Sequence, residues 1–376
     1  MKLLHVTPAF YPASVYGGPI ESVYQLCRHL ARTGCDVRVL TTDANGPHRV
    51  LDVDTDRELE LAANLRVRYC HRQIRHSVSF SILRLLPAYV RWADLVHLTA
   101  VYSFPTIPTL LASKVFGKPV VWSSRGALQR WKGSTRTVSK ALWERVCRVS
   151  APKRLILHVT SEEEAKESIG RFPGVETAII PNGVEIPDAL SPPNSNGMFR
   201  LLYLGRLHPK KGVENLLTAC KLLNEESTLN WSLTLAGPGD HAYADTLRKR
   251  IQEYELSDRV RMVGEVRREK KQTLFDNSDL TIVPSYTENF GMVVAESLAH
   301  GVPVIASRGT PWRRVEEIGC GLWIENDPES LAKAIEQISR MPLREMGRRG
   351  REWMAKEFSW DKQAQQVLTC YKTLCT

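Results

Sequence analysis

The carboxylates of Glu288 and Glu296 have a residue type and a spacing that could serve chemistry. They lie eight positions apart in SYTENFGMVVAE, residues 285–296, directly after an apolar run LTIV that Pro284 closes. Three roles compete for such a pair: a hydrolytic acid and base, two ligand-binding carboxylates, or two solvated surface acids with no joint task. The distance between the two carboxylates helps to separate these roles.

A strand, a loop and then a helix are predicted here, so Glu288 falls in the loop and Glu296 about one turn into the helix. A helical path would separate the acids by ~12 Å and an extended path by ~26 Å, whereas retaining glycosidases hold theirs ~5 Å apart. The spacing therefore disfavours hydrolysis. Carboxylates bind vicinal hydroxyls, and free N–H groups near Phe290 and Gly291 suit phosphates. A sugar at one end and a ribose at the other fits this layout.

A second group of charged residues follows another predicted strand, in YLGRLHPKKGVENLL. Arg206 comes directly after the strand, and Lys210 and Lys211 precede a helix that begins near Gly212. Cations at a helix N-terminus oppose the helix dipole, at a cost of roughly 0.3–1 kcal/mol. An anion between them and the helix removes that conflict, so Arg206 and Lys211 are candidate diphosphate ligands. A solvated basic loop is the competing interpretation.

Gly17 and Gly18 are a third candidate, between the opening strand and a helix in YPASVYGGPIESVYQL. Paired glycines let the backbone approach a ligand closely, and the helix N-terminus beyond them offers N–H groups to an anion. An ordinary turn explains the same residues. The preceding loop is too long for a GxGxxG dinucleotide fingerprint, which weighs against a nicotinamide oxidoreductase. The closer letter match, GPGDHA, is interpreted as a turn because Pro238 lacks an N–H group.

Short apolar runs alternate with longer amphipathic segments, which is typical of strand–helix–strand units and parallel sheets. The strand candidates are 2–7, 36–42, 65–70, 95–99, 119–124, 155–160 and 177–181, and then 199–205, 231–237, 259–264, 279–284, 302–307 and 321–325. Between the two sets lies a linker-like stretch rich in Pro, Asn and Ser. We predict two successive α/β domains, with a ligand in the cleft between them outside the carboxyl ends of the strands.

Composition narrows the class of protein further. The 376 residues, 43% hydrophobic and 24% charged, suffice for two or three domains with sizeable cores. The formal charge of +10 indicates anionic partners, but no recognised nucleic-acid module accompanies it. The eight cysteines lack zinc spacing and are predicted to be reduced, buried thiols in a cytoplasm.

Neither a signal peptide nor a membrane span is predicted, since the N-terminal apolar run is too short and the stretch 78–92 is cut by Arg84 and Pro87. Basic residues gather in the first half with Trp92, Trp131 and Trp143 among them. This pattern suits weak contact with an anionic membrane surface, and a solvated face is the competing interpretation. The basic residues are Arg66, Arg68, Arg72, Arg75, Arg84, Arg91, Arg130, Lys132, Arg136, Lys140, Arg145, Arg148, Lys153 and Arg154.

Together these segments resemble the family 4 glycosyltransferases of the GT-B type, which have two Rossmann-like α/β domains. The resemblance rests on ENFGMVVAE, the GRLHPKKG loop, the N-terminal GGP and the SEEE and PNGV segments. SSRGALQRW and SRGTPWRRVEEIGCGLWI resemble members that assemble bacterial lipopolysaccharide and capsule. The implied domains are an acceptor-binding domain at 1–183, a nucleotide-sugar domain at 184–357 and a C-terminal helix at 358–376 that returns to the first domain.

The resemblance implies a retaining, hexosyl-type glycosyltransferase that needs no metal or other cofactor. Arg206 and Lys211 match the pair that neutralises the diphosphate leaving group, Glu288 matches the acid near the donor sugar, and Glu296 matches the acid that holds the ribose. We expect the first three to be catalytic. The other implied donor contacts are Gly17, Gly18, Val266, Asn289, Phe290, Gly291 and Met292.

Two departures from the family pattern concern the first domain. Many relatives carry a histidine where this chain has Arg125, in Ser124-Arg125-Gly126. Arginine stays charged and cannot serve as a base, so Arg125 is assigned to phosphate or acceptor binding. Many relatives also have His-x-His after the fourth strand, where His97 and Thr99 stand here. His97 is interpreted as a core histidine and is kept out of the catalytic set.

The implied donor is a UDP- or GDP-linked sugar, and the implied acceptor is a glycan or a polyprenyl-diphosphate-linked glycan. The product would be lipopolysaccharide O-antigen, capsule or exopolysaccharide, made in the cytoplasm and at the inner face of the cell membrane. Nucleic acid is not an expected partner. The alternative is a non-catalytic nucleotide- or carbohydrate-binding protein on the same scaffold, against which the presence of both glutamates and of the Arg206 and Lys211 pair argues.

Overall fold

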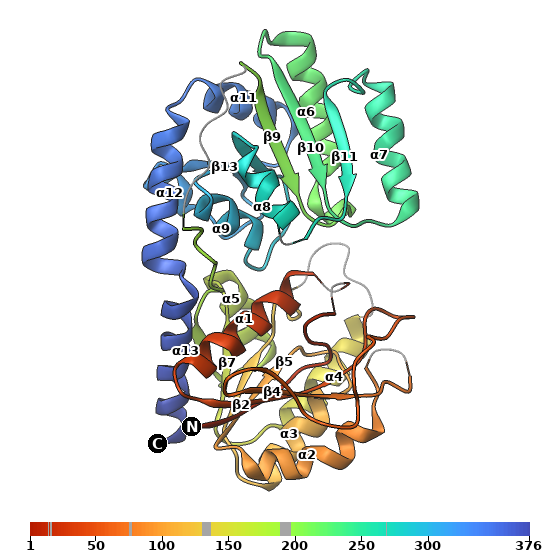
Figure 1. Ribbon diagram of the computed structural model, residues 1–376, viewed down its shortest axis with the longest axis vertical. Helices are drawn as coiled ribbons and strands as arrows, with labels where there is room; N and C mark the ends of the chain where they lie inside the picture. Colours follow the sequence, from red (N-terminus) through yellow and green to blue (C-terminus); the bar gives the residue numbers. More distant parts are fainter. Residues whose placement is uncertain (14, 16, 75–76, 130–136, 189–196, 268) are drawn as a thin grey trace. The chain divides into compact units, whose positions relative to one another are not determined.

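The structure is a computed structural model that describes residues 1–13, 15, 17–74, 77–129, 137–188, 197–267 and 269–376 (Figure 1). These residues form two compact units: an N-terminal unit of Met1–Gly183 with Trp360–Thr376, and a C-terminal unit of Val184–Ser359. The second division lies after residue 359, two residues later than the expected 357. Backbone pairing accounts for the difference, because the Val184 N–H donates to the Phe358 carbonyl at 2.7 Å.

The C-terminal unit contains a six-stranded parallel sheet in the order β11-β10-β9-β12-β13-β14. In chain order this is 3-2-1-4-5-6, the order of dinucleotide-binding folds, in which the direction of winding reverses between the first and fourth strands. The strands are β9 (Phe199–Leu204), β10 (Trp231–Ala236), β11 (Val260–Gly264), β12 (Leu280–Val283), β13 (Val304–Ser307) and β14 (Gly321–Ile324).

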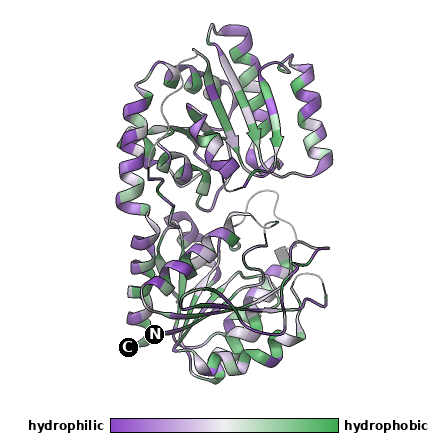
Figure 2. Cartoon of the chain, viewed as in Figure 1, coloured by the Kyte–Doolittle hydropathy of each residue, from purple (hydrophilic) through white to green (hydrophobic). Residues whose placement is uncertain are grey.

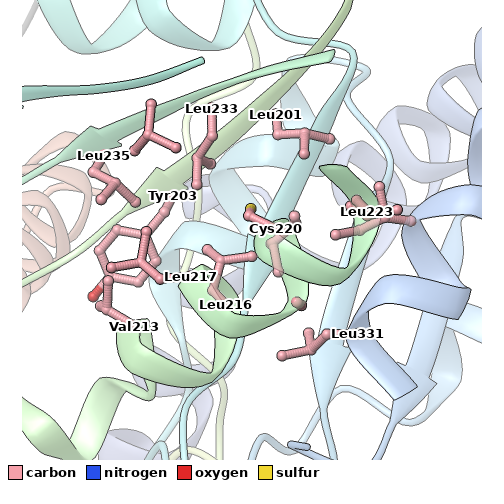
Figure 3. Close-up of a cluster of buried hydrophobic side chains, with 14 of the residues drawn as sticks. Leu201, Tyr203, Val213, Leu216, Leu217, Cys220, Leu223, Leu233, Leu235 and Leu331 are labelled. Carbon is pink, nitrogen blue, oxygen red and sulfur yellow. The ribbon is translucent and has the colours of Figure 1, made fainter. Parts of the chain in front are cut away.

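Helices cover both faces of this sheet. One face packs against α6 (Val213–Glu226), α7 (His241–Glu253) and α11 (Pro328–Ser339), and the other against α8 (Glu269–Asp276), α9 (Met292–Ala299) and α12 (Leu343–Phe358). Figure 3 shows the core between the sheet and α6, where Leu216, Leu217 and Cys220 of α6 lie beneath strand side chains. Short helices η2 (Pro209–Lys211) and α10 (Arg314–Ile318) complete the unit.

The N-terminal unit contains an eight-stranded sheet in the order β3-β4-β2-β1-β5-β6-β7-β8. All neighbouring strands are parallel except the edge strand β3, which is antiparallel to β4. The strands are β1 (Lys2–Val6), β2 (Asp36–Thr42), β3 (Leu59–Ala62), β4 (Leu65–Cys70), β5 (Leu95–Thr99), β6 (Val120–Ser123), β7 (Leu155–Val159) and β8 (Glu176–Ile179).

Two sets of helices cover the N-terminal sheet. One face packs against α1 (Gly18–Arg32) and α13 (Trp360–Cys375), and the other against α2 (Phe80–Trp92), α3 (Thr106–Val115), α4 (Thr137–Ser150) and α5 (Glu162–Arg171). The helices alternate hydrophobic and hydrophilic residues, as Figure 2 shows. Among the described residues, no helix is long and apolar enough to cross a membrane.

Every predicted strand is present, and the sequence analysis missed only β3 among the strands that the described residues form. β3 is a four-residue edge strand with no buried residue, so its sequence carries little hydrophobic pattern. The cysteines are free, as predicted, and six of the eight are buried, whereas Cys370 and Cys375 are half-buried.

A hydrogen-bonded chain in the core joins α13 to the N-terminal sheet, and its direction can be derived. His158 Nε2 must donate to the Ile180 carbonyl at 2.9 Å, so Nδ1 of the neutral ring accepts from Ser123 Oγ at 2.7 Å. Ser123 Oγ then accepts from His97 Nε2 at 2.6 Å, and His97 Nδ1 accepts from the Tyr371 hydroxyl. Each ring therefore has one tautomer, and His97 is a buried histidine with both nitrogens partnered, as predicted.

We predict that Tyr371→Phe destabilises the N-terminal unit by about 1–3 kcal/mol, because the buried His97 Nδ1 loses its donor. Urea unfolding followed by tryptophan fluorescence measures the change. Thr373→Ala, on the exposed side of the same helix, is the matched control and should leave the unfolding midpoint unchanged. Equal midpoints for both variants would contradict the derived direction of the chain.

Candidate functional site

The charged residues singled out in the sequence follow neighbouring strands at the carboxyl edge of the C-terminal sheet. Arg206 and Lys211 follow β9, and Glu288 and Glu296 follow β12. β9 and β12 are paired neighbours, and the winding of the sheet reverses between them. Open α/β sheets bind their ligands beyond the carboxyl ends of the strands at such a reversal.

Glu288 is anchored by residues from both loops. Its Oε1 accepts from the Lys211 ammonium and from Ser285 Oγ at 2.8 Å. The side chains of Lys211 and Glu288 are 19% and 15% exposed, so the ion pair is poorly screened by water. The sequence analysis assigned Lys211 to an anion, and in the structure its ammonium pairs with the Glu288 carboxylate.

Backbone contacts fix the same loops against each other. The Tyr286 N–H donates to the Lys210 carbonyl at 2.9 Å, and the Glu288 N–H donates to the Gly309 carbonyl at 2.7 Å. A Cβ at Gly212 would meet the Pro284 carbonyl oxygen at 2.0 Å, and φ there is +65°. Only glycine permits this approach, and these contacts join the loops after β9, β12 and β13.

Glu296 is the fifth residue of α9, and its carboxylate is only partly hydrogen-bonded. Its Oε1 accepts from the Lys271 ammonium of α8, whereas its Oε2 is buried without a hydrogen-bond partner in the described residues. Asn289 Oδ1, in the preceding loop, is likewise buried without a partner there. Buried acceptors without partners are costly, so both atoms are suited to hydroxyl or N–H donors of a ligand.

The loop before α9 presents main-chain donors. Gly291 caps α9 in the left-handed conformation, with φ 78° and ψ 62°. The Phe290 carbonyl accepts from the Trp312 indole, and the two rings pack edge to face at 5.1 Å. The N–H groups of Asn289, Phe290 and Gly291 donate to no described residue, and Met292 begins the helix. An anion is the natural acceptor for such a set.

A positive field surrounds the loop after β9. The pKa of His208 is lowered by burial and by the nearby charges of Arg206, Lys210 and Lys211. The pKa of Lys210 is lowered by burial, and further by Lys211 and Arg206, against the opposing effect of Glu288. The Arg206 guanidinium is exposed and makes no hydrogen bond or ion pair with the described residues. The cluster therefore favours an anionic ligand.

Val266 lies just beyond β11, at the same edge but two strands away from β9. Its side chain is half-buried, and beside it the Arg267 guanidinium pairs with Glu265 at 2.8 Å. No contact joins Val266 to the Glu288 and Lys211 pair, so the structure leaves its predicted role untested.

Gly17, Gly18 and Arg125 belong to the N-terminal unit and follow strands at its carboxyl edge. Gly17 has φ 71° and ψ −142°, a conformation that favours glycine, and Gly18 begins α1. Arg125, after β6, has φ 50°. Its guanidinium donates to Asn182 Oδ1, and its Nε is buried without a partner among the described residues.

Glu164 holds the loop that carries Arg125, and the sequence analysis gave it no role. Its Oε1 accepts from Ser124 Oγ and the Gly126 N–H, both at 2.6 Å. Its Oε2 accepts from Thr160 N–H at 2.8 Å and Thr160 Oγ at 2.9 Å. This fully bonded carboxylate is not within ion-pair distance of Arg125, although its charge opposes the lowering of the Arg125 pKa that burial causes.

The buried histidines near Arg125 respond to its charge. Burial and then the Arg125 guanidinium lower the pKa of His158 to about 3, and burial, Arg125 and His158 lower that of His5 to about 3. Burial and the neighbouring His5, His158 and Arg125 hold the pKa of His97 well below its usual range. All three rings are neutral at physiological pH, so among the described residues that act on these histidines Arg125 is the one cation.

Lys271 is the other residue that the sequence analysis missed. It comes from α8, whose sequence EKKQTLFD carries two adjacent lysines with no motif around them. Only the packing of α8 near α9 brings its ammonium to Glu296. No group of three or more His, Cys, Asp or Glu side chains able to hold a metal ion occurs among the described residues.

Comparison with known proteins gives two family matches. Residues 16–186 match Glycosyltransferase Family 4, and residues 191–353 match Glycosyl transferases group 1. A curated relative, GDP-mannose:cellobiosyl-diphosphopolyprenol alpha-mannosyltransferase of Xanthomonas oryzae pv. oryzae, is 27% identical over 352 residues, which are 91% of this chain and 88% of that protein.

Solved structures resemble the whole chain in fold. Sucrose-phosphate synthase of Thermosynechococcus elongatus has a TM-score of 0.76 at 22% identity, covering 99% of this chain and 98% of its own. HepE of Anabaena, crystallised with UDP-glucose, has a TM-score of 0.75 at 18% identity, covering 99% of this chain and 100% of its own. The fold is therefore the GT-B fold, as predicted.

We predict that Gly309→Ala destabilises the C-terminal unit by about 1–3 kcal/mol, through overpacking. A Cβ there would meet the carbonyl oxygens of Ser285 and Tyr286 at 2.4 Å, so the loop that holds Glu288 must shift. Differential scanning calorimetry measures the loss. Gly170→Ala, whose Cβ would meet nothing within 4 Å, is the control. A melting temperature equal to that of the wild type would show that the loop is looser than described.

Proposed function

Because this chain belongs to the family 4 glycosyltransferases, we propose that it is a retaining hexosyltransferase using a nucleotide-diphosphate sugar. The acceptor we propose is a glycan linked to polyprenyl diphosphate, and the product a bacterial surface polysaccharide such as O-antigen, capsule or exopolysaccharide. The Xanthomonas relative is named for a GDP-mannose donor and a diphosphopolyprenol acceptor. GDP-mannose is therefore the first donor to test, followed by UDP-sugars.

One observation carries the proposal: two ion-paired glutamates flank a loop whose N–H groups face no described acceptor. Glu296 Oε2 is buried without a partner and is suited to a ribose hydroxyl. Glu288, held by Lys211 and Ser285, is suited to the hydroxyls of the donor sugar. The backbone from Asn289 to Met292 lies between them in sequence and suits the diphosphate. We assign Val266 to contact with the nucleobase of the donor.

In the proposed reaction the acceptor hydroxyl attacks the anomeric carbon on the face from which the nucleotide diphosphate departs. The bond from the anomeric carbon to the phosphate oxygen breaks, and the bond to the acceptor oxygen forms. The acceptor's proton passes to the departing phosphate, so no protein base and no metal ion is required. Arg206 and Lys211 stabilise the charge that develops on the diphosphate.

Binding of the diphosphate also changes the contacts of Lys211 in this proposal. The Lys211 ammonium has three N–H donors, and its ion pair with Glu288 competes with the diphosphate for the same positive charge. Binding of the donor is therefore proposed to draw Lys211 toward the phosphates, while Ser285 continues to hold Glu288.

Two parts of the N-terminal unit complete the proposal. Gly17 and the start of α1 at Gly18 supply backbone N–H groups to the diphosphate. Arg125 is assigned to a phosphate, because its buried Nε has no partner among the described residues and arginine cannot act as a base. The proposed place of action is the inner face of the cell membrane.

The competing function is non-catalytic binding of a nucleotide or carbohydrate on the same scaffold. Incubation with GDP-mannose and a panel of UDP-sugars, with and without a polyprenyl-diphosphate glycan, separates the two. Acceptor-dependent release of nucleotide supports the transferase. Nucleotide binding without release for every donor would favour the non-catalytic alternative.

We predict that Lys211→Ala lowers turnover about 100-fold or more, because one charge-stabilising donor is lost at the transition state. The variant should fold normally, since Ser285 still holds Glu288. Nucleotide release with saturating donor measures turnover. Lys249→Ala, on the exposed side of α7, is the matched control. Wild-type turnover in Lys211→Ala would show the assignment of Lys211 to be wrong.

We predict that Glu296→Ala weakens nucleotide binding by roughly 10- to 100-fold, the effect of losing a hydrogen bond to a charged group. Titration calorimetry with GDP and UDP alone measures this affinity independently of turnover. Glu253→Ala, an exposed glutamate of α7, should bind as the wild type does. An unchanged affinity in Glu296→Ala would exclude the ribose contact.

A further inference from the structure

The exposed side of α4 carries a row of aliphatic side chains. Val138, Leu142, Val146 and Val149 are 83%, 64%, 40% and 69% exposed. Their spacing of four, four and three residues places them on one face of the helix, over a length of ~16 Å. The opposite face is the buried one, where Cys147 lies.

The neighbouring helix α3 extends this row. Its Leu111 and Val115 are 45% and 74% exposed and lie one helical turn apart. The Lys114 ammonium donates to the Val149 carbonyl at the end of α4, at 2.7 Å, which brings the two exposed rows together. We call Leu111, Val115, Val138, Leu142, Val146 and Val149 the aliphatic patch. A contiguous patch of this kind marks a docking surface more often than isolated residues do.

The charges beside the aliphatic patch have one sign. Lys114 is the only charged residue of α3, and the exposed charged residues of α4 are Arg145 and Arg148. The single acid in the two helices, Glu144, is 4% exposed. Arg145 and Arg148 make no ion pair with the described residues. An apolar surface on two helices whose exposed charges are all cations is complementary to an anionic lipid headgroup layer over acyl chains.

The described tryptophans do not supply this contact, which corrects the sequence analysis. Trp143 turns its indole N–H inward to the Val101 carbonyl at 2.8 Å, and Trp92 is covered by the Arg38 guanidinium at 4.1 Å. Both are half-buried and pack against the core. Trp131 lies outside the described residues. Aliphatic rather than aromatic residues are therefore exposed here.

We propose that the aliphatic patch of α3 and α4 docks this protein onto an anionic lipid bilayer, with its aliphatic side chains inserted among the headgroups. A second copy of the chain is a poorer occupant, because two such surfaces would bring Arg145 and Arg148 against like charges. The inference deepens the proposed function and rests on it in one respect: a lipid-linked acceptor is found at that surface.

Vesicle co-sedimentation of the full chain tests the docking. The vesicles contain phosphatidylcholine and phosphatidylglycerol in a ratio of two to one, with phosphatidylcholine alone as comparison. We expect the wild type to bind the anionic vesicles and to retain part of that binding at high salt, because screening removes the charge contribution but not the apolar one. No binding to anionic vesicles would overturn the proposal.

Two pairs of variants separate the apolar from the ionic contribution. Leu142→Ser should weaken binding about tenfold, from lost apolar burial, and Arg148→Ser about fivefold, from one lost cation. Their matched controls are Ile169→Ser and Lys166→Ser, because Ile169 and Lys166 are exposed residues of α5 outside the aliphatic patch. Equal binding by Leu142→Ser and Ile169→Ser would overturn the proposal, as would concentration-dependent self-association that Leu142→Ser abolishes.

Turnover with a water-soluble acceptor distinguishes a failure of this inference from a failure of the proposed function. All four variants should release nucleotide as the wild type does when no vesicles are present. Vesicle binding without turnover of any donor would refute the transferase and leave the docking surface intact. Turnover without vesicle binding would refute the docking surface and leave the transferase intact.

Discussion

The backbone contact between the loops that follow β9 and β12 is the constraint on which the candidate site depends. The Tyr286 N–H donates to the Lys210 carbonyl, and Gly212 approaches the Pro284 carbonyl so closely that no Cβ fits. The reversal of strand order lies between β9 and β12, the position at which open α/β sheets bind their ligands. Lys211 and Glu288 meet because these contacts hold the two loops together, and the ion pair then fixes both side chains.

Such a site stores free energy that a ligand can recover. A buried acceptor without a donor costs about 1–3 kcal/mol, and Glu296 Oε2 and Asn289 Oδ1 are two such atoms near the start of α9. Lys271 holds the Glu296 carboxylate by its other oxygen. In the proposed reaction, donor hydroxyls would satisfy these atoms, and binding would therefore gain more than the same contacts on a mobile surface.

The sequence predicted the architecture better than it predicted the site's partners. Parallel strands read as apolar runs, so all except the exposed edge strand β3 were found. The positions of Arg206, Lys211 and Glu288 after strands followed from the same pattern. Lys271 and Glu164 were missed because their contacts join separate elements. Trp143 was grouped with residues for membrane contact because sequence cannot tell which side of α4 is covered.

The two candidate anion-binding arginines differ in their surroundings, which bears on selectivity. Arg206 is exposed, so water and salt screen its attraction for a phosphate. Arg125 is surrounded by neutral histidines, and burial lowers its pKa. Glu164, the carboxylate whose charge opposes that lowering, is already bonded to four other donors. A phosphate beside Arg125 would therefore gain more from one contact in that drier environment, and Arg125 would contribute more than Arg206 to discrimination between charged and neutral ligands.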